Sequence, residues 1–527
     1  MSKYLLGAFL MMGLLLVSCR TDFSFTPSVG QLRFSKTTVY LDTVFSQIGS
    51  STYRLRVYNT SNDDISIPLI ALGKGNDSKF RLMVDGLTGE DINNDGLGDG
   101  KTFRNVEVLA KDSLYVMVEV TARITDANPT DFLYTDQIQF GTDTDYQKVD
   151  LVTLIQDAYF IYPKRITSTT YEGISLGLDD EGKNKIYYGS PLDPADPVNG
   201  DELHWTAGKP YVIYGYAQVP DGKTLVVDPG ARVHFHADAG LIVAKNGHIK
   251  VNGEAPPAND PKDLTKEVIF QGDRLETDFA DVPGQWGTVM MLSQESDNIL
   301  HHLTIKNATV GLLIQNYATI TDPGIPKVTL KNVQIYQSTN VGILARKAAV
   351  TGTNVVVGDA GQSSLACTMG GSYRFEQSTF NNTWPSSKQV ALTLNNYLQI
   401  SSTEIKPFDL TQASFTNCIF YGNNSQEVYL SKAEANAFTF NFDHCLFKFY
   451  SYTPVFPPMY IFLADNNTFG NLTNLNPRFK NTKNHPFQID SNSGAIGKGV
   501  VLPNTTADIL NRNRNNPPDL GAYSYLP

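Results

Sequence analysis

Cysteine and charge are both scarce in this sequence. It has 4 cysteines among 527 residues, and 18% of its residues are charged. So few cysteines exclude the disulfide framework that stabilises small secreted domains. Acidic residues outnumber basic ones, the net charge is −11, and no cluster of Lys and Arg is visible along the chain. We therefore predict no binding to nucleic acid, which depends on such clusters.

Long hydrophobic runs are missing as well. The apolar run over residues 4–17 has 14 residues, fewer than the ~20 that a membrane-spanning helix needs. A basic residue precedes this run, and Leu16, Val17 and Ser18 lead directly to Cys19. A short apolar run between a basic start and small residues is typical of a targeting segment.

This ending resembles the lipobox of bacterial lipoproteins, including those of the Bacteroidetes. The resemblance implies that residues 1–18 are a signal peptide, that Cys19 is the lipid attachment site, and that residues 19–30 are a tether. The membrane partner would be the outer membrane, with the protein facing either the periplasm or the exterior. The alternative is an ordinary secretory signal in which the cysteine has no role.

Turn residues and aromatics are abundant, with 41 Gly, 27 Pro and 11% aromatic residues. This composition and the length favour an all-β protein of two or three domains. Residues 31–157 contain short segments of alternating apolar and polar residues, such as TYRLRVYN at 52–59. They resemble immunoglobulin-like β-sandwiches of the hydin and major-sperm-protein type, which implies a spacer or protein-contact module.

Residues 158–222 are rich in Asp, Gly and Pro and are predicted to be a transition segment and N-terminal cap. From 223 to 470 one strand pattern recurs at unequal spacing, which a stacked solenoid permits because insertions enter its turns. One polar column runs His302, Asn332, Asn354, Gln377, Asn417 and His444, and the column three residues later runs Ile305, Ile335, Val357, Phe380, Phe420 and Phe447. The pattern resembles right-handed parallel β-helix proteins of the pectate-lyase type.

Stacked coils place equivalent residues in ladders, since neighbouring strands lie about 4.8 Å apart. We therefore expect Phe380, Phe420 and Phe447 to form one internal stack. Cys418 and Cys445 occupy equivalent positions and should be neighbouring buried thiols, with a disulfide as the alternative. The polar column is interpreted as turn residues whose amides bond to backbone groups.

Residues 471–527 resemble the closing segment of β-helix proteins related to polysaccharide lyases, through Asn476-Pro-Arg-Phe479 and Pro518-Asp-Leu-Gly-Ala-Tyr523. We expect this segment to cover the last coil, whose edges would otherwise pair with other chains. The resemblance implies a fold and no single activity, because β-helices carry many functions.

The outward ladders predict no catalytic residues. They are Thr304, Gln334, Val356, Thr379, Ile419 and Leu446 in one row, and Lys306, Tyr336, Gly358, Asn381, Tyr421 and Lys448 in the other. Neither row carries a carboxylate, so neither supplies an acid–base pair. The sequence therefore favours a non-catalytic envelope protein that binds glycan or another envelope or host component. The alternatives are a polysaccharide lyase or glycoside hydrolase with a site assembled from turns, and a structural assembly partner.

Two metal patterns stand out. Asp91, Asn93, Asp95, Leu97 and Asp99 follow the spacing of an EF-hand-like calcium loop around a glycine. The residue at the position of the final glutamate is a threonine, and strands are expected on both sides, so a plain Asn/Asp/Gly hairpin is the alternative.

The other metal pattern is a pair of histidines two residues apart on one strand. His234 and His236 could share an outward face. Because no third ligand is evident, a solvated strand face is the favoured interpretation over a zinc site.

Aromatic residues on rigid turns are the candidate ligand-binding residues. Their rings could stack on sugars, with half-buried packing as the alternative for each. The candidates are Tyr336, Tyr373, Trp384, Tyr397 and Tyr421.

Overall fold

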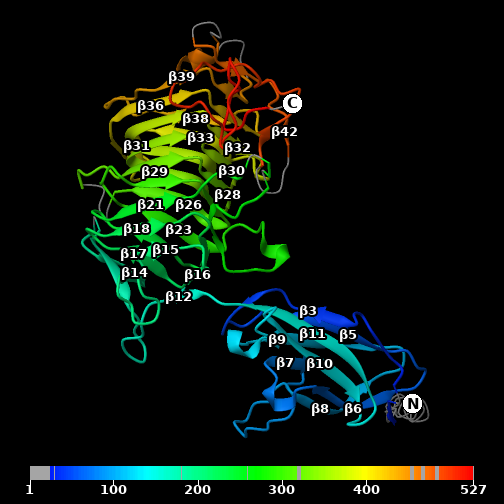
Figure 1. Ribbon diagram of the computed structural model, residues 1–527. Helices are drawn as coiled ribbons and strands as arrows, with labels where there is room; N and C mark the ends of the chain where they lie inside the picture. Colours follow the sequence, from blue (N-terminus) through cyan, green and yellow to red (C-terminus); the bar gives the residue numbers. More distant parts are fainter. Residues whose placement is uncertain are drawn as a thin grey trace, which may run out of the picture. The chain divides into compact units, whose positions relative to one another are not determined.

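The computed structural model describes residues 24–28, 30–179, 181–257, 259–260, 262–316, 322–451, 456–464, 469–480 and 486–525. The chain divides after Asp157 into two compact units. Nearly all regular structure in both units is β, as Figure 1 shows. Across the described ranges no helix combines the length and the apolar character needed to cross a membrane. Cys19 and the predicted lipobox lie outside the described residues.

The first unit is a sandwich of two sheets around one core. One sheet joins β1 (Thr26–Pro27), β6 (Ile65–Leu72), β10 (Leu133–Gly141), β11 (Tyr146–Gln156) and β3 (Thr38–Tyr40), with β4 (Val44–Phe45) beside β11 and β8 (Thr102–Val108) beside β6. The other joins β2 (Leu32–Phe34), β5 (Tyr53–Asn59), β9 (Ser113–Val120) and β7 (Phe80–Val84). Alternation along β5 buries Leu55 and Val57 and exposes Arg54 and Arg56.

The second unit is a parallel β-helix, which confirms the predicted fold class. Its first sheet stacks β12 (Tyr159–Ile161), β16 (Tyr211–Ile213), β19 (Arg232–Phe235), β22 (Val268–Gly272), β25 (Leu303–Lys306), β28 (Gln334–Ser338), β30 (Val356–Ala360), β32 (Thr379–Asn382), β37 (Ile419–Gly422), β40 (Leu446–Phe447) and β41 (Leu472–Thr473). We call it the eleven-stranded sheet. In Figure 1 these strands follow one another up the stack of coils.

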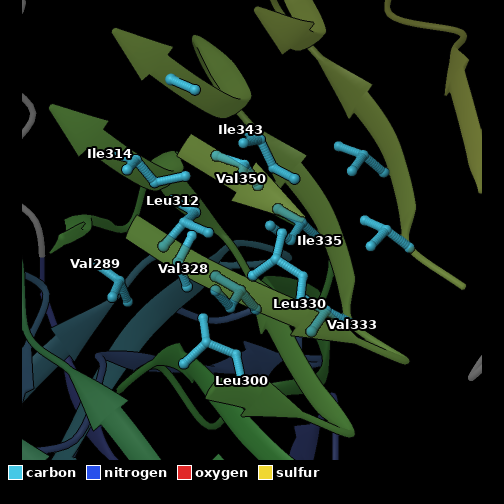
Figure 2. Close-up of a cluster of buried hydrophobic side chains, with 14 of the residues drawn as sticks. Val289, Leu300, Leu312, Ile314, Val328, Leu330, Val333, Ile335, Ile343 and Val350 are labelled. Carbon is cyan, nitrogen blue, oxygen red and sulfur yellow. The ribbon is translucent and has the colours of Figure 1, made fainter. Parts of the chain in front are cut away.

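The second sheet has seventeen strands and completes the wall around the same core. Its strands are β13 (Gly173–Leu178), β14 (Asn184–Pro191), β15 (His204–Trp205), β17 (Tyr216–Val219), β18 (Thr224–Val227), β20 (Gly240–Val243), β21 (His248–Asn252), β23 (Trp286–Met291), β24 (Ile299–His301), β26 (Ala308–Gln315), β27 (Lys327–Lys331), β29 (Val341–Thr353), β31 (Ser363–Glu376), β33 (Val390–Asn395), β36 (Leu410–Thr416), β38 (Val428–Ser431) and β39 (Asn441–Asp443). Figure 2 shows how aliphatic side chains from both sheets, among them Ile335 and Ile343, fill the interior.

The remaining regular elements are short. Two antiparallel hairpin-like pairs join β34 (Tyr397–Gln399) to β35 (Ile405–Pro407) and β42 (Phe479–Lys480) to β43 (Gln488–Ile489). The 3₁₀ helices are η1 (Gly75–Asp77), η2 (Ile124–Asp126), η3 (Thr277–Phe279) and η4 (Pro458–Leu463).

The predicted register is the observed one. Phe380 pairs with Phe420, and Phe420 pairs with Phe447, in adjacent parallel strands. The three rings are fully buried and stack at 5.3 Å between successive centroids. Cys418 and Cys445 are buried, unpaired thiols in neighbouring coils.

The predicted polar column marks a repeated backbone bend. All six of its residues have positive φ angles, from +44° at His302 to +56° at Asn417. Asn tolerates this left-handed conformation better than most residues, because its short polar side chain bonds locally. The amides bond to one another as well as to backbone, since Asn354 Nδ2 donates to Asn332 Oδ1 at 2.8 Å.

Parallel pairing begins earlier than residue 223. Strand β12 pairs in parallel with β16, β16 pairs in parallel with β19, and β17 pairs in parallel with β20. The range 158–222, predicted to be a transition segment, thus contributes strands to the solenoid. The hairpin of β13 and β14 packs Ile174 and Leu176 against Ile242 and Met290 on the outside of the seventeen-stranded sheet.

The C-terminal segment differs from our expectation. The interior of the last coils is closed by η4, whose Phe462 stacks on Phe442 at 4.9 Å. Residues 486–525 instead lie along the outer face of the eleven-stranded sheet, where Ile509 and Tyr523 pack on Val356 and Leu520 packs on Ile419. This segment, red in Figure 1, runs back beside β32 and β30. The apolar residues of the outer ladder explain the placement, because they need a cover from water.

Candidate functional site

The outer ladders of the eleven-stranded sheet are not an open groove in the upper coils. Gln334, Val356, Thr379, Ile419 and Leu446, predicted to point outward, are all at most 2% exposed beneath residues 486–525. A polysaccharide chain therefore cannot lie on this face there. The apolar members of the ladder, which look out of place on a solvent face, are the sequence signal for such a cover.

A polar network is buried under this cover. Gln334 Nε2 donates to Glu267 Oε1 at 2.8 Å, while the hydroxyls of Tyr336 and Tyr523 donate to Gln334 Oε1 at 2.6 and 2.9 Å. Burial raises the pKa of Glu267. Because these polar groups satisfy one another away from solvent, the network holds the C-terminal segment in place.

Two of the five predicted aromatic candidates are interior residues. Tyr336 is 6% exposed and belongs to the network just described. Tyr373 is fully buried inside the coils, where its hydroxyl donates to Gly370 O at 2.7 Å. Both predictions were wrong because strand alternation and the C-terminal cover, rather than residue type, decide which rings reach the surface.

Tyr397 lies apart from the other candidates. It begins the β34–β35 hairpin beside the seventeen-stranded sheet, and its hydroxyl lies 2.7 Å from the hydroxyl of Ser431 on β38. The half-buried ring thereby fastens the hairpin to the coil.

One of the remaining two candidates, Tyr421, is brought together with two residues that the sequence did not single out as site residues, and Trp384 stands on the neighbouring turn. Trp384 follows β32, Tyr421 is on β37, and Lys448 and Tyr450 follow the start of β40 in the next coil. The Lys448 ammonium lies 5.1 Å from the Tyr421 ring centroid and 5.5 Å from that of Tyr450. We call these four residues the aromatic strip.

Neighbouring turns hold the strip together. Asn423 Nδ2 donates to Thr383 O at 2.9 Å, next to Trp384, and Gln426 Nε2 donates to Tyr450 O at 2.9 Å. The turn after β37 therefore bridges the turns that carry Trp384 and Tyr450. Tyr450 is 49% exposed, while Trp384, Tyr421 and Lys448 are half-buried.

Glu427 is the buried support of that turn. It accepts hydrogen bonds from the backbone N–H of Asn424 at 2.7 Å and of Ala391 at 2.9 Å. Burial raises the pKa of Glu427 to about 8. Gly422 is required beside it, because a Cβ there would lie 2.2 Å from a Glu427 oxygen. The sequence alone could not identify Glu427 as buried, since the residues around it in the chain resemble those around an exposed glutamate.

The strip can hold a sugar by two physical means. Aromatic rings offer flat apolar faces to the C–H faces of a pyranose, and the ammonium donates hydrogen bonds to its hydroxyls. A fixed Lys over two rings also costs less conformational entropy when a ligand binds than a mobile Lys would.

The predicted calcium loop is closed by its own hydrogen bonds. Asp99 Oδ2 accepts the N–H of Ile92 at 2.7 Å, Asp91 Oδ2 accepts that of Gly96 at 2.8 Å, and Asp95 Oδ1 accepts that of Leu97 at 2.9 Å. Within the ranges that the structure describes, no group of three or more His, Cys, Asp or Glu is arranged to hold a metal ion. Calcium binding at residues 91–99 stays a prediction.

The two histidines on β19 and just after it have different surroundings. His234 is 4% exposed, and burial lowers its pKa to about 4. His236 is exposed, its Nδ1 lies 2.7 Å from Asp273 Oδ2, and this hydrogen bond raises its pKa. The exposed His236 fits the favoured interpretation of a solvated strand face, whereas the buried His234 contradicts it.

Comparisons with known proteins add no inference to the description above. No known protein family and no curated protein sequence matches the chain. A protein of unknown function from Porphyromonas gingivalis W83 is 12% identical over 29% of this chain and 58% of that chain, with a TM-score of 0.16. The catalytic unit of a thermostable GH87 α-1,3-glucanase from Streptomyces thermodiastaticus strain HF3-3 is 10% identical over 75% of this chain and 80% of that chain, with a TM-score of 0.25. Likenesses this low carry no inference about activity.

Proposed function

We propose that the protein is a lipid-anchored component of a bacterial outer membrane that binds glycan without cleaving it. The observation that carries the glycan part is the aromatic strip, in which one ammonium lies within 5.5 Å of the centroids of two tyrosine rings. The rigid turns of stacked coils hold these side chains at a fixed spacing, as a pre-organised binding surface requires.

The non-catalytic part rests on the lack of a pair of facing carboxyl groups among the described residues of the strip. Asp359 is beside it, and its Oδ1 accepts the Thr383 N–H at 3.2 Å next to Trp384. Glycoside hydrolysis uses two carboxyl groups that flank the scissile bond. Glu427 is fully buried and bonds to backbone N–H groups, so it supports the turn and does not face a ligand. No carboxylate of the described chain forms an ion pair with Lys448.

A glycan array with the full-length protein in detergent tests the binding. Glycan hits should then be incubated with the protein and assayed for reducing ends and unsaturated products. Binding without turnover is expected, and turnover would overturn the proposal in favour of a lyase or hydrolase.

Two tyrosines of similar exposure provide the variant and its control. Tyr450→Ala should weaken glycan binding by about tenfold, since a stacked ring contributes on the order of 1 kcal/mol or more. Tyr429→Ala, on a strand of the seventeen-stranded sheet, removes a ring that is 52% exposed against 49% for Tyr450. Its binding should equal that of the wild type.

The anchor part of the proposal rests on the apolar run at residues 4–17, whose last residues Leu16 and Val17 lead through Ser18 to Cys19. Metabolic labelling with palmitate should mark the wild type and not Cys19→Ala. An unlabelled wild-type protein, or a labelled Cys19→Ala, would exclude the lipid anchor and leave glycan binding to be judged by the array.

A further inference from the structure

The outer face of the four-stranded sheet in the first unit gathers arginines from distant parts of the sequence. Arg33 comes from β2, Arg54 and Arg56 from β5, and Arg81 from β7, and all four are exposed. The register sets Arg33 beside Tyr58 and Arg56 beside Tyr115. We call these six residues the arginine–tyrosine face. Its arginines are scattered along the sequence, so no cluster of Lys and Arg is visible there.

The face is electropositive in a chain whose net charge is −11. Glu119 is the one acidic residue in these rows of the sheet, and it forms an ion pair with Arg81 at 3.4 Å. In the described part of the chain, no carboxylate lies within ion-pair distance of Arg33, Arg54 or Arg56. Three guanidinium groups thus remain available to an anionic partner.

The tyrosines hold two of these groups in position. The Arg33 guanidinium lies 4.6 Å from the Tyr58 ring centroid, and that of Arg56 lies 5.1 Å from Tyr58 and 5.4 Å from Tyr115. Arg56 Nε also donates to Ser113 Oγ at 2.8 Å. Stacking leaves the edge of a guanidinium free for paired hydrogen bonds to a carboxylate or a sulfate, and it lowers the entropy lost on binding.

From these contacts we propose that the arginine–tyrosine face binds an acidic polysaccharide that carries carboxylate or sulfate groups. Such a chain presents sugar rings and anions in alternation, which matches tyrosine rings set among guanidinium groups. A folded acidic protein is a poorer match, because stable protein interfaces are depleted of charge at their centre. The middle of this face is occupied by Arg54, Arg56 and Tyr115.

This site is independent of the aromatic strip, which belongs to the second unit. The strip selects sugars by ring stacking and hydroxyl contacts, whereas the arginine–tyrosine face selects them by charge. Binding of the acidic polysaccharide should therefore weaken as salt is added and should persist in Tyr450→Ala.

The test measures binding of dextran sulfate and of polygalacturonate to the full-length protein in detergent, with neutral dextran as the uncharged comparison. The wild type should bind at least one of the two polyanions and not neutral dextran. Arg54→Gln combined with Arg56→Gln should weaken that binding by about tenfold or more, because each hydrogen bond to a charged group contributes ~1.5–3 kcal/mol. Arg56→Lys keeps the charge but loses the planar set of guanidinium N–H donors. It should therefore weaken polyanion binding less than the double variant does.

A charge-matched control uses the opposite sheet of the same unit. Arg104→Gln combined with Lys148→Gln removes two exposed cations from β8 and β11, each of which has a carboxylate partner. Binding by this variant should stay within about twofold of the wild type. If both double variants lost polyanion binding equally, diffuse electrostatic attraction, and not the arginine–tyrosine face, would account for the binding. Binding of phosphatidylglycerol vesicles without polyanion binding would overturn the proposal in favour of a lipid surface.

Discussion

The rings of Phe420 and Phe447 lie 5.3 Å apart and are inclined by 14°, one coil above the other. Phe380 continues the stack below at the same spacing. Parallel in-register pairing forces this arrangement, since equivalent residues of adjacent coils must stand one strand spacing apart. The interior of the upper β-helix is therefore a column of rings whose members depend on one another for burial.

Removing the central ring should strongly destabilise the second unit. Phe420→Ala is expected to lower its free energy of unfolding by ~3–5 kcal/mol, because the fixed coils cannot collapse into the cavity. Phe420→Leu should cost less. The measurement is urea denaturation followed by a probe of the second unit, with Tyr429→Ala as an exposed control that should change stability by no more than ~0.5 kcal/mol. Equal stability of Phe420→Ala and the control would contradict the stacked core.

Asn417 allows backbone conformation and hydrogen bonding to be separated. Its φ is +56°, its Nδ2 donates to Val500 O at 2.8 Å, and its Oδ1 accepts the Val500 N–H at 2.9 Å. Asn417→Gly keeps the conformation and loses both hydrogen bonds, whereas Asn417→Ala loses both bonds and adds strain. We expect Asn417→Ala to be the less stable of the two by roughly 1 kcal/mol. If Asn417→Gly unfolded at a lower temperature than Asn417→Ala, the left-handed backbone conformation would not be what position 417 requires.

The C-terminal segment should be needed for solubility. Removing residues 486–527 would uncover Val356, Ile419 and Leu446, which are fully buried beneath it. A newly exposed apolar row on a sheet face is expected to bind the dye ANS and to promote association, which size-exclusion chromatography would detect. A truncated protein that stays monomeric and binds no dye would mean that the segment does not cover this face in solution.

Glu427 should make stability depend on pH. Burial raises its pKa to about 8 in the folded state, above its ordinary value in the unfolded chain. Between those two values the unfolded state releases the proton while the folded state keeps it, so stability falls as pH rises through this window and is level above it. Glu427→Gln removes the titration, and its melting temperature relative to the wild type should rise from about pH 4 to about pH 9.

The control for that series is Glu434→Gln, whose side chain is 83% exposed beside Lys432. Its melting temperature relative to the wild type should not change with pH. If the Glu427→Gln difference is also flat, the carboxyl of Glu427 is not held in its neutral form.

Calcium remains open to a direct measurement. If residues 91–99 bind Ca²⁺, millimolar calcium should raise the melting temperature of the first unit, since a ligand that binds only the folded state stabilises it. Asp91→Asn with Asp95→Asn should abolish the shift. The carboxylates now bond to backbone N–H groups of their own loop, so an unchanged melting temperature would identify an ordinary hairpin.

The register of the solenoid could be predicted because it is a local property repeated many times. Each coil repeats an apolar residue, a residue in the left-handed bend and a second apolar residue three positions later. Asn332 and Asn354 carry that bend at φ of +55° and +52°, and the strands after them pair in the expected register. The stacking of the coils then follows from strand geometry, and no single long-range contact is needed to set it.

The candidate site could be predicted only in part. Trp384 and Tyr421 were recognised as aromatic turn residues, but the contact of Tyr421 with Lys448, and of Lys448 with Tyr450, depends on which coil follows which. Tyr336 looked equally exposed and is buried by a segment that lies about 190 residues later in the chain. The sequence around Tyr336 contains no pattern that predicts its burial by the C-terminal segment.

Alternation and repetition along the chain therefore suffice to specify the strands, the coils and the inward rings, because residues next to one another in the chain and in adjacent coils decide each of these. The surface is decided otherwise. Arg33, Arg56 and Arg81 are separated by more than twenty residues each and carry no shared motif, and they meet because β2, β5, β9 and β7 hydrogen-bond side by side. Long-range strand pairing and the path of the C-terminal segment select which side chains water can reach, and any ligand must bind there.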